Sequence, residues 1–497
     1  MLIEEHLKGT IHIPINKGND KFEVIIHEFT EDDVIHDLCN ITSRCCDDQT
    51  FSIGGVRPAE LAIKLRLEIP GVNAYTLYGA KIRLYSSYNA APVPDDKWLL
   101  RGEFWVTSAK RTKTVYTLRA SDAIIWLDSG SYIKGETNEK DPIYEICSSA
   151  VRTLDANFNE GIAKYVNQRL RDCEVDEINF HIRKDVTNNS PFLHNSNEIY
   201  GYAIIPEDIS GGHGVKTARD YAGWIAELTA GCIQMIVFPD TPEQCDLFLT
   251  PFGYKPTDDC TESFRSVWEN PVKIPYETIE LDSCDIADYE LYIQKECVTT
   301  YDNVWWANGG GFAKYKGNIT LDLTDNLFLV GRHYHNKEWA KPWGILVNIG
   351  NQLGTVTKRP FSLKCHPVFE SLEKMPKLGQ RIEIEENPGK WKESLITKMV
   401  WKFRGGWEFG CAGSDSRVLS QAAKRSLASH AEEKCKAYAN IVANNAGNGI
   451  EEAKRAASDA FDQANAAMDN GNIRVTWDQY NIDIPDIYAR LSALESR

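Results

Sequence analysis

Two histidines one residue apart, His333 and His335, with Glu338 close behind them, form the strongest metal-ligand pattern in the sequence. Side chains at i and i+2 of a strand point to the same face, so the two imidazoles could share one cation. Arg332 and Lys337 stand beside them and would repel that cation, and no third ligand is evident. The pattern favours a solvated, aromatic-rich loop, and we expect no metal site and no other cofactor.

The motifs of the common enzyme classes are missing or incomplete. His27-Glu28 lacks the second histidine of a zinc-protease helix. The glycine-rich run 211–217 contains Lys216 and Thr217, but a valine separates its last glycine from the lysine. A flexible loop that leads into a helix cap fits this run better than a phosphate loop. Glycoside hydrolysis needs a pair of carboxylates, but such pairs can always be found among 71 acidic residues, so their presence is no evidence for a hydrolase. We therefore predict no catalytic residues and a protein that is not an enzyme.

The charge balance limits the possible partners. The 497 residues carry 55 Lys and Arg against 71 Asp and Glu, which gives a net charge of −16. Tight sequence-independent binding to DNA needs clustered basic residues, so this composition argues against it. An acidic surface suits a wall past which DNA slides without sticking, although acidic soluble proteins are also common.

The N-terminus lacks the features of a secretion signal. Glu4 and Glu5 stand where a signal needs a basic start and an apolar run. The longest apolar stretches, 123–127 and 235–238, are far below the roughly 18 residues that span a bilayer. The 13 cysteines include no C-x-x-C pair, so we expect reduced and mostly buried thiols. The sequence predicts a protein with no membrane anchor that is made and kept in the cytoplasm, unless it leaves by a route that needs no signal.

Residues 1–130 are predicted to form a first small β-barrel or sandwich. Polar and apolar residues alternate along 61–69 and 81–85, and again in step through 100–108 and 115–120, with a basic turn at 110–113 between the last two. Several short strands with one buried face favour such a closed fold. The run 121–128 looks like a helical turn that plugs one end.

Residues 131–270 are predicted to form an inserted α+β domain. A helix is expected behind Asp141-Pro142, and a second helix opens at Thr217 with Asp220 three positions on. Gly231 is expected to end this second helix in the left-handed conformation. The strands 232–238 and 245–249, joined by a turn at 239–242, complete a helix and hairpin.

Residues 271–415 return to a β pattern, which predicts a second small β-barrel with associated loops. The strongest local signal is Arg404-Gly405-Gly406, which lies between two aromatic strands and predicts a hairpin. The fold class is therefore mainly β with an α+β insertion.

Residues 416–497 form an alanine-rich helical segment. Four apolar residues near the end follow spacings of 3, 4 and 3, which is the seam of a coiled coil: Ile484, Ile487, Leu491 and Leu494. So short a seam cannot hold chains together alone, since about 3–4 heptads are needed. As a coiled coil it could only extend an oligomer formed upstream. A single amphipathic helix docked on its own domain fits the pattern equally well.

The order of these segments resembles the N-terminal hub of bacteriophage tail-tip and baseplate proteins, including tail-associated lysins and tail spike hubs. The resemblance spans residues 50–415, and no single motif is diagnostic. It rests on four stretches in the family's order, namely 98–128, 217–232, 319–328 and 360–406. The proline often found in the turn near Asp325-Asn326 is missing here.

This resemblance implies a structural virion protein. It implies a homotrimer in which two barrels per chain alternate around a ring, so that a threefold object presents a sixfold surface to the tail tube or distal tail ring. The hub would cap or close the tube at the tip of the virion tail and act in DNA ejection, with genomic DNA passing it without sequence-specific binding. It would be assembled in the host cytoplasm and could also contact the tape-measure protein, fibres or receptor-binding proteins.

Two other functions stay open at this point. A phage-encoded hydrolase or depolymerase for cell wall or capsule would need an acid such as Glu269 or Asp302. A carbohydrate- or receptor-binding tail protein would use aromatic faces, for which Trp305, Trp306 and the pair Trp339/Trp343 are candidates.

Overall fold

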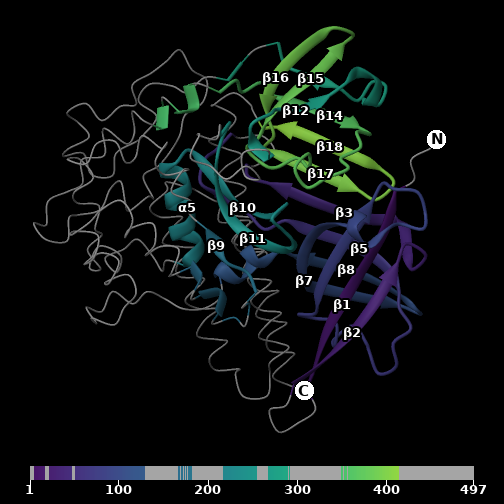
Figure 1. Ribbon diagram of the computed structural model, residues 1–497. Helices are drawn as coiled ribbons and strands as arrows, with labels where there is room; N and C mark the ends of the chain where they lie inside the picture. Colours follow the sequence, from purple (N-terminus) through teal and green to yellow (C-terminus); the bar gives the residue numbers. More distant parts are fainter. Residues whose placement is uncertain are drawn as a thin grey trace, which may run out of the picture. The chain divides into compact units, whose positions relative to one another are not determined.

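The computed structural model describes residues 5–16, 22–46, 51–128, 217–254, 267–288 and 356–412, with shorter pieces within 166–181, at 290–291 and within 349–354. The chain divides into two compact units, Met1–Ser416 and Arg417–Arg497, and every described residue lies in the first. This part of the chain is mainly β, as the sequence predicts (Figure 1). The helices expected behind Asp141 and after residue 416 lie outside the described residues.

Eleven strands form one continuous sheet in the order β13-β14-β18-β17-β3-β5-β8-β7-β6-β1-β2. Its strands from the N-terminal part of the chain are β1 (His6–Asn16), β2 (Phe22–Thr30), β3 (Val34–Arg44), β5 (Glu60–Arg66), β6 (Lys81–Ser87), β7 (Leu99–Thr112) and β8 (Val115–Ser121). Its strands from the later part are β13 (Asp285–Ile286), β14 (Phe361–Cys365), β17 (Lys398–Lys402) and β18 (Gly406–Cys411). Strands from both predicted β segments therefore share one sheet.

The alternation read from the sequence places the core on one face of this sheet. Leu61, Ile63 and Leu65 of β5 are buried, whereas Ala62 and Lys64 between them are half-buried and Glu60 and Arg66 at the two ends are exposed. β8 and β14 repeat the same pattern. Burial of alternate residues is what a half-buried strand requires, so the period-two predictions for these strands are confirmed.

Two smaller sheets flank the large one. The first contains β4 (Gly55–Val56), β10 (Gly231–Phe238), β11 (Thr241–Pro251) and β9 (Phe180–His181). The second contains β12 (Val272–Ile274), β15 (Arg381–Asn387) and β16 (Lys390–Leu395). The predicted hairpin after the second helix is confirmed as β10 and β11.

Helix α5 (Ala218–Leu228) begins as predicted at Thr217. The Thr217 side chain accepts a hydrogen bond from the Asp220 backbone N–H, and the Asp220 carboxylate accepts one from the Thr217 N–H, which completes a capping box. The helix buries Tyr221, Trp224 and Ile225 on its apolar face.

The predicted end of this helix was wrong by one residue. Ala230, with φ of 53°, takes the left-handed conformation, and Gly231 is already the first residue of β10. Gly231 is needed for a different reason, since a Cβ there would stand 2.2 Å from the carbonyl oxygen of Thr250 on β11. The glycine therefore permits close approach of two strands, whereas the sequence suggested a helix cap.

Two hairpin turns were predicted from the sequence, and the structure confirms one of them and shortens the other. The turn between β17 and β18 is confirmed, with Arg404 at φ 57° and Gly406 at φ 71°. The basic turn expected over residues 110–113 is shorter, because β7 continues to Thr112 and pairs there with Val115. Lys113, at φ 59°, begins a two-residue connection. The basic residues before it are strand residues.

Three short 3-10 helices complete the described elements: η1 (Asp95–Lys97), η2 (Ala123–Asp128) and η3 (Tyr276–Thr278). η2 is the helical turn expected after β8, and it buries Ala123, Ile124 and Leu127. Apolar side chains from both β segments and from the α5–β10–β11 unit belong to one buried cluster. The nine described cysteines are free thiols, and burial raises the pKa of several of them, including Cys45.

The capping box gives a local stability prediction. Replacing Thr217 by alanine removes the side-chain acceptor at the N-terminus of α5, which typically costs about 1 kcal/mol. We expect peptides covering 217–228 to exchange backbone hydrogens about fivefold faster, measured by hydrogen–deuterium exchange. T217S, which keeps the hydroxyl, should exchange like the unmodified chain. Equal rates in T217A would show that the capping box contributes nothing.

Candidate assembly site

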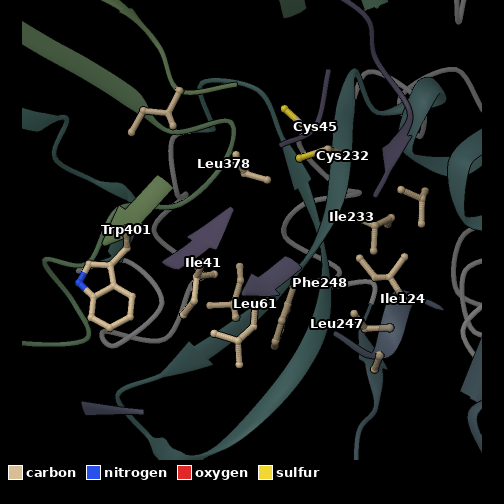
Figure 2. Packing of buried hydrophobic residues seen from close by; sticks show 14 of the residues in the cluster. Ile41, Cys45, Leu61, Ile124, Cys232, Ile233, Leu247, Phe248, Leu378 and Trp401 are labelled. Carbon is tan, nitrogen blue, oxygen red and sulfur yellow. The ribbon is translucent and has the colours of Figure 1, made fainter. Parts of the chain in front are cut away.

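The two β segments meet where β3 pairs with β17. The strands run antiparallel with Lys398 opposite Arg44 and Lys402 opposite Asn40. Trp401 stands opposite Ile41, and Figure 2 shows both side chains within the buried cluster. Additional backbone hydrogen bonds continue the junction, from Cys45 N to Thr397 O at 3.0 Å and from Phe403 N to Cys39 O at 3.0 Å. Main-chain hydrogen bonds therefore join the two segments.

Glu5 reinforces this junction from the N-terminal side. Its carboxylate accepts hydrogen bonds from Trp401 Nε1 at 2.9 Å and from the backbone N–H of Arg404 at 2.6 Å. Glu31 adds a second carboxylate, 3.1 Å from His6 Nδ1 and 3.4 Å from Arg404 Nη2. Glu5 is only 8% exposed, so its charge depends on these donors for stabilisation.

Arg101 of β7 lies against the same hairpin. Its guanidinium carbon is 4.9 Å from the ring centre of Trp401 and 5.4 Å from that of Trp407, while Nε donates to Ser86 Oγ at 2.6 Å. The side chain is 2% exposed, and the nearest Glu5 oxygen is 4.0 Å away. Aromatic faces attract a buried cation, so Arg101 ties β7 to β17 and β18.

A pocket opens beside Arg101 and is lined by β3, β7, β10, β17, β18 and the loop before β15. Lys377 of that loop donates to the carbonyl oxygens of Leu372 and Met375. Burial, and then the nearby Arg101 charge, lower the pKa of Lys377 to about 7. The side-chain amide of Gln234 on β10 donates to the carbonyl oxygen of the next residue, Leu378, and accepts from its backbone N–H. The loop is thereby fixed against the α5–β10–β11 unit.

Two buried acids, Asp122 and Glu103, also line this pocket. Asp122 accepts hydrogen bonds from Ala59 N at 2.9 Å and Ile124 N at 3.0 Å, but burial outweighs these donors and raises its pKa to about 7. Burial also raises the pKa of Glu103, whose carboxylate lies 2.9 Å from Arg83 Nε. Both carboxylates are held by hydrogen bonds or ion pairs within the protein, so we assign both acids a structural role.

Strand β2 forms one edge of the large sheet. It pairs only with β1 and ends the strand order, so one row of its backbone groups has no partner strand in the sheet. Val24 and Ile26 on this strand are 54% and 59% exposed. An apolar edge strand of this kind is suited to pairing with another chain.

The residues singled out from the sequence mostly lie elsewhere. The seam residues Ile484, Ile487, Leu491 and Leu494 lie outside the described residues. So do the possible metal ligands His333, His335 and Glu338, the aromatic candidates Trp305, Trp306, Trp339 and Trp343, and Asp302. Glu269 is described and exposed, and its backbone carbonyl accepts a hydrogen bond from Arg381 at 3.1 Å. Nothing in the described structure brings Glu269 to a second candidate acid.

Sequence reasoning missed Glu5, Arg101, Asp122 and Lys377. Arg101 carries little signal, because Arg101 and Glu103, two positions apart, show only the alternation expected of a half-buried strand. Glu5 carries none, since its partner Trp401 lies 396 positions away.

Within the described ranges, no group of three or more His, Cys, Asp and Glu side chains is arranged to hold a metal ion. No helix found there has the length and apolar character that a bilayer crossing demands.

Several solved structures match this chain, whereas no family model and no curated protein sequence does. A tail protein from Neisseria meningitidis MC58 is 10% identical, with 82% of this chain and 96% of that one covered and a TM-score of 0.36. A component of the E. coli type VI secretion system, described as structurally similar to T4 bacteriophage tail proteins, is 8% identical, with 77% and 75% covered and a TM-score of 0.31. A chain of the phage P2 baseplate is 11% identical, with 82% and 100% covered and a TM-score of 0.31.

These three structures are described as a tail protein, a component of a type VI secretion system and a phage baseplate. Identities and TM-scores are low throughout, and we draw the proposals below from this chain's own residues.

The Glu5 network predicts that loss of the Glu5 carboxylate destabilises the β17–β18 hairpin, which lies far from Glu5 in the sequence. In E5Q one carboxylate oxygen becomes an amide N–H₂, which cannot accept from the Arg404 N–H or from Trp401. We expect a loss of about 1–3 kcal/mol in the free energy of local opening, seen as faster hydrogen exchange over 398–411. The exposed substitution E277Q is the control and should leave this exchange unchanged. If E5Q exchanges like E277Q, the network does not hold the hairpin.

Asp122 predicts a pH dependence of stability. Its folded pKa of about 7 lies above the usual 3.8, so the folded chain binds this proton more tightly than the unfolded chain does. The free energy of unfolding must therefore fall as the pH rises between these two values. We expect the thermal midpoint of the unmodified chain to fall relative to that of D122N across this range. The exposed substitution D95N should follow the unmodified chain, and a constant difference for D122N would contradict the prediction.

Proposed function

We propose that this protein is a structural subunit of a phage-type tail tip, in which it forms the hub that caps or closes the tail tube. The observation that carries this proposal is the continuous sheet, built from strands far apart in the chain and ending in the exposed, apolar edge strand β2. Such a sheet offers a rigid body with an edge suited to assembly with other chains. The described side chains that are buried and charged hold strands and loops together, which fits a structural role.

The proposed assembly is a homotrimer with two small barrels per chain. The strands of the two predicted β segments form one continuous sheet that is joined where β17 pairs with β3, and each segment is proposed to curl into a barrel of its own. The predicted domains 1–130, 131–270, 271–415 and 416–497 belong to this proposal. Two similar barrels per chain would let three copies present a six-part ring to a sixfold tail tube or distal tail ring.

The remaining partners follow from this position in the virion tail. Genomic DNA would pass the hub during ejection, and the tape-measure protein, fibres or receptor-binding proteins would attach nearby. The C-terminal helical region would extend the trimer through the short coiled-coil seam of Ile484, Ile487, Leu491 and Leu494.

The oligomeric state tests this proposal directly. One chain has a mass of 56.1 kDa, so mass photometry of the full chain should show a trimer of three times that mass. V24K/I26K places two charges on the β2 edge, which opposes pairing with another chain. We expect this variant to shift the population towards monomers, whereas K374E/K390E, at exposed positions on other elements, should stay trimeric.

The seam provides a second comparison. I487D/L491D should weaken the trimer less than V24K/I26K, because a seam this short extends an existing oligomer. A stable monomer of the unmodified chain at micromolar concentration would overturn the hub proposal. A trimer that V24K/I26K leaves intact would overturn the role of the β2 edge alone.

A further inference from the structure

The face of the large sheet that points away from the core carries a cluster of basic residues. Three cross-strand rows define it on β5, β8 and β7, namely Ala62–Arg119–Ser108, Lys64–Thr117–Lys110 and Arg66–Val115–Thr112. Residues of one row lie on the same side of a sheet, and rows two residues apart share that side. We call Arg66, Lys110 and Arg119, which are all exposed, the basic face. Lys64 lies beside them, but it is half-buried and interacts with another group of the chain, so it is not counted.

This face contrasts with the rest of an acidic chain. Its three rows contain three exposed bases and no acid, and Glu60 and Glu68 lie only beyond their ends. Lys113 in the adjoining turn adds a fourth exposed cation, so four exposed cations can contact a partner. Strands about 4.8 Å apart and steps of about 6.7 Å along each strand bring the three charges of the basic face within roughly 10 by 14 Å. At physiological salt, charges more than about 8 Å away are screened, so the local cluster outweighs the net charge of −16.

The other residues in these rows indicate the chemistry of the partner. Ser108, Thr112 and Thr117 supply hydroxyl groups between the cations, and no aromatic residue stands on this part of the face. Protein interfaces depend on a buried aromatic or apolar centre, which these rows lack. Lysine, arginine, serine and threonine side chains are the usual contacts to nucleic-acid phosphates.

We propose that the basic face binds the phosphate backbone of double-stranded DNA without sequence preference. The proposal rests on the tail-tip role, in which genomic DNA passes this subunit. Charge complementarity selects the partner, and the flat strand surface reaches no base edge, so the contact carries no sequence information. The contact is weak and dependent on salt, which suits DNA that must be released. It revises the expectation, drawn from composition, of a uniformly acidic wall.

Fluorescence anisotropy with a labelled duplex of arbitrary sequence tests this contact on the full chain. Four phosphate contacts give a slope of about −3.6 for log K against log salt, so affinity should fall on the order of 50-fold from about 50 to about 150 mM KCl. R66E/R119E reverses two charges at exposed positions. We expect it to bind at least about tenfold more weakly, with a slope smaller by about 2. A duplex of a second sequence should bind equally well.

K374E/K390E changes the net charge by the same amount away from the basic face, and it should bind DNA like the unmodified chain. Equal losses in both variants, or no binding at the lower salt, would overturn the proposal. A change in oligomer mass in R66E/R119E without any DNA binding would assign the face to a protein contact instead. Mass photometry of the unmodified chain separates the two proposals, since a monomer that binds DNA overturns only the hub, and a trimer that ignores DNA overturns only the basic face.

Discussion

The antiparallel pairing of β3 with β17 is the interaction on which the rest of the described structure depends. It connects Asn40–Arg44 to Lys398–Lys402 and thereby makes one sheet from two distant parts of the chain. Without it, β17 would lose its place next to β3, β18 and β14 beyond β17 would be cut off from the N-terminal strands, and Trp401 would lose its place opposite Ile41. The hydrogen bonds of Glu5 and the aromatic contacts of Arg101 then become possible, because both require the β17–β18 hairpin beside β1 and β7.

Burying a charged group at this junction is unfavourable in free energy, and each such group has specific interaction partners beside it that offset the loss of hydration. Glu5 accepts from an indole and a backbone N–H, Arg101 lies over two indole rings, and Lys377 donates to two carbonyl oxygens. Removing one partner would leave a buried charge without compensation, which costs more than the intact pair contributes. These groups therefore specify one arrangement of strands more strongly than apolar packing alone, which tolerates substitution more readily.

Sequence reasoning succeeded where the cause of a structure is local. Alternating residues predicted the buried face of β5, and Thr217 with Asp220 predicted the start of α5. It was wrong at Gly231, because the close approach of Thr250 is a contact between strands and leaves no mark at the glycine itself. It could not predict the order of strands or the Glu5 network. The period-two pattern shows which face of a strand is buried, but it does not show which other strand pairs with it. The basic face was missed for the same reason: Arg66, Lys110 and Arg119 become neighbours only once β5, β8 and β7 are paired.

The separation of 396 positions between Glu5 and Trp401 also has a consequence for biosynthesis. A ribosome adds about 5–20 residues per second, so roughly 20–80 s pass between the emergence of these two residues. During that interval β3 has β5 on one side and an open edge on the other, because β17 has not yet been made. The nascent chain must therefore protect this edge from other nascent chains until the last strands arrive. Translation speed and chaperone access thus become determinants of the yield of correctly folded protein.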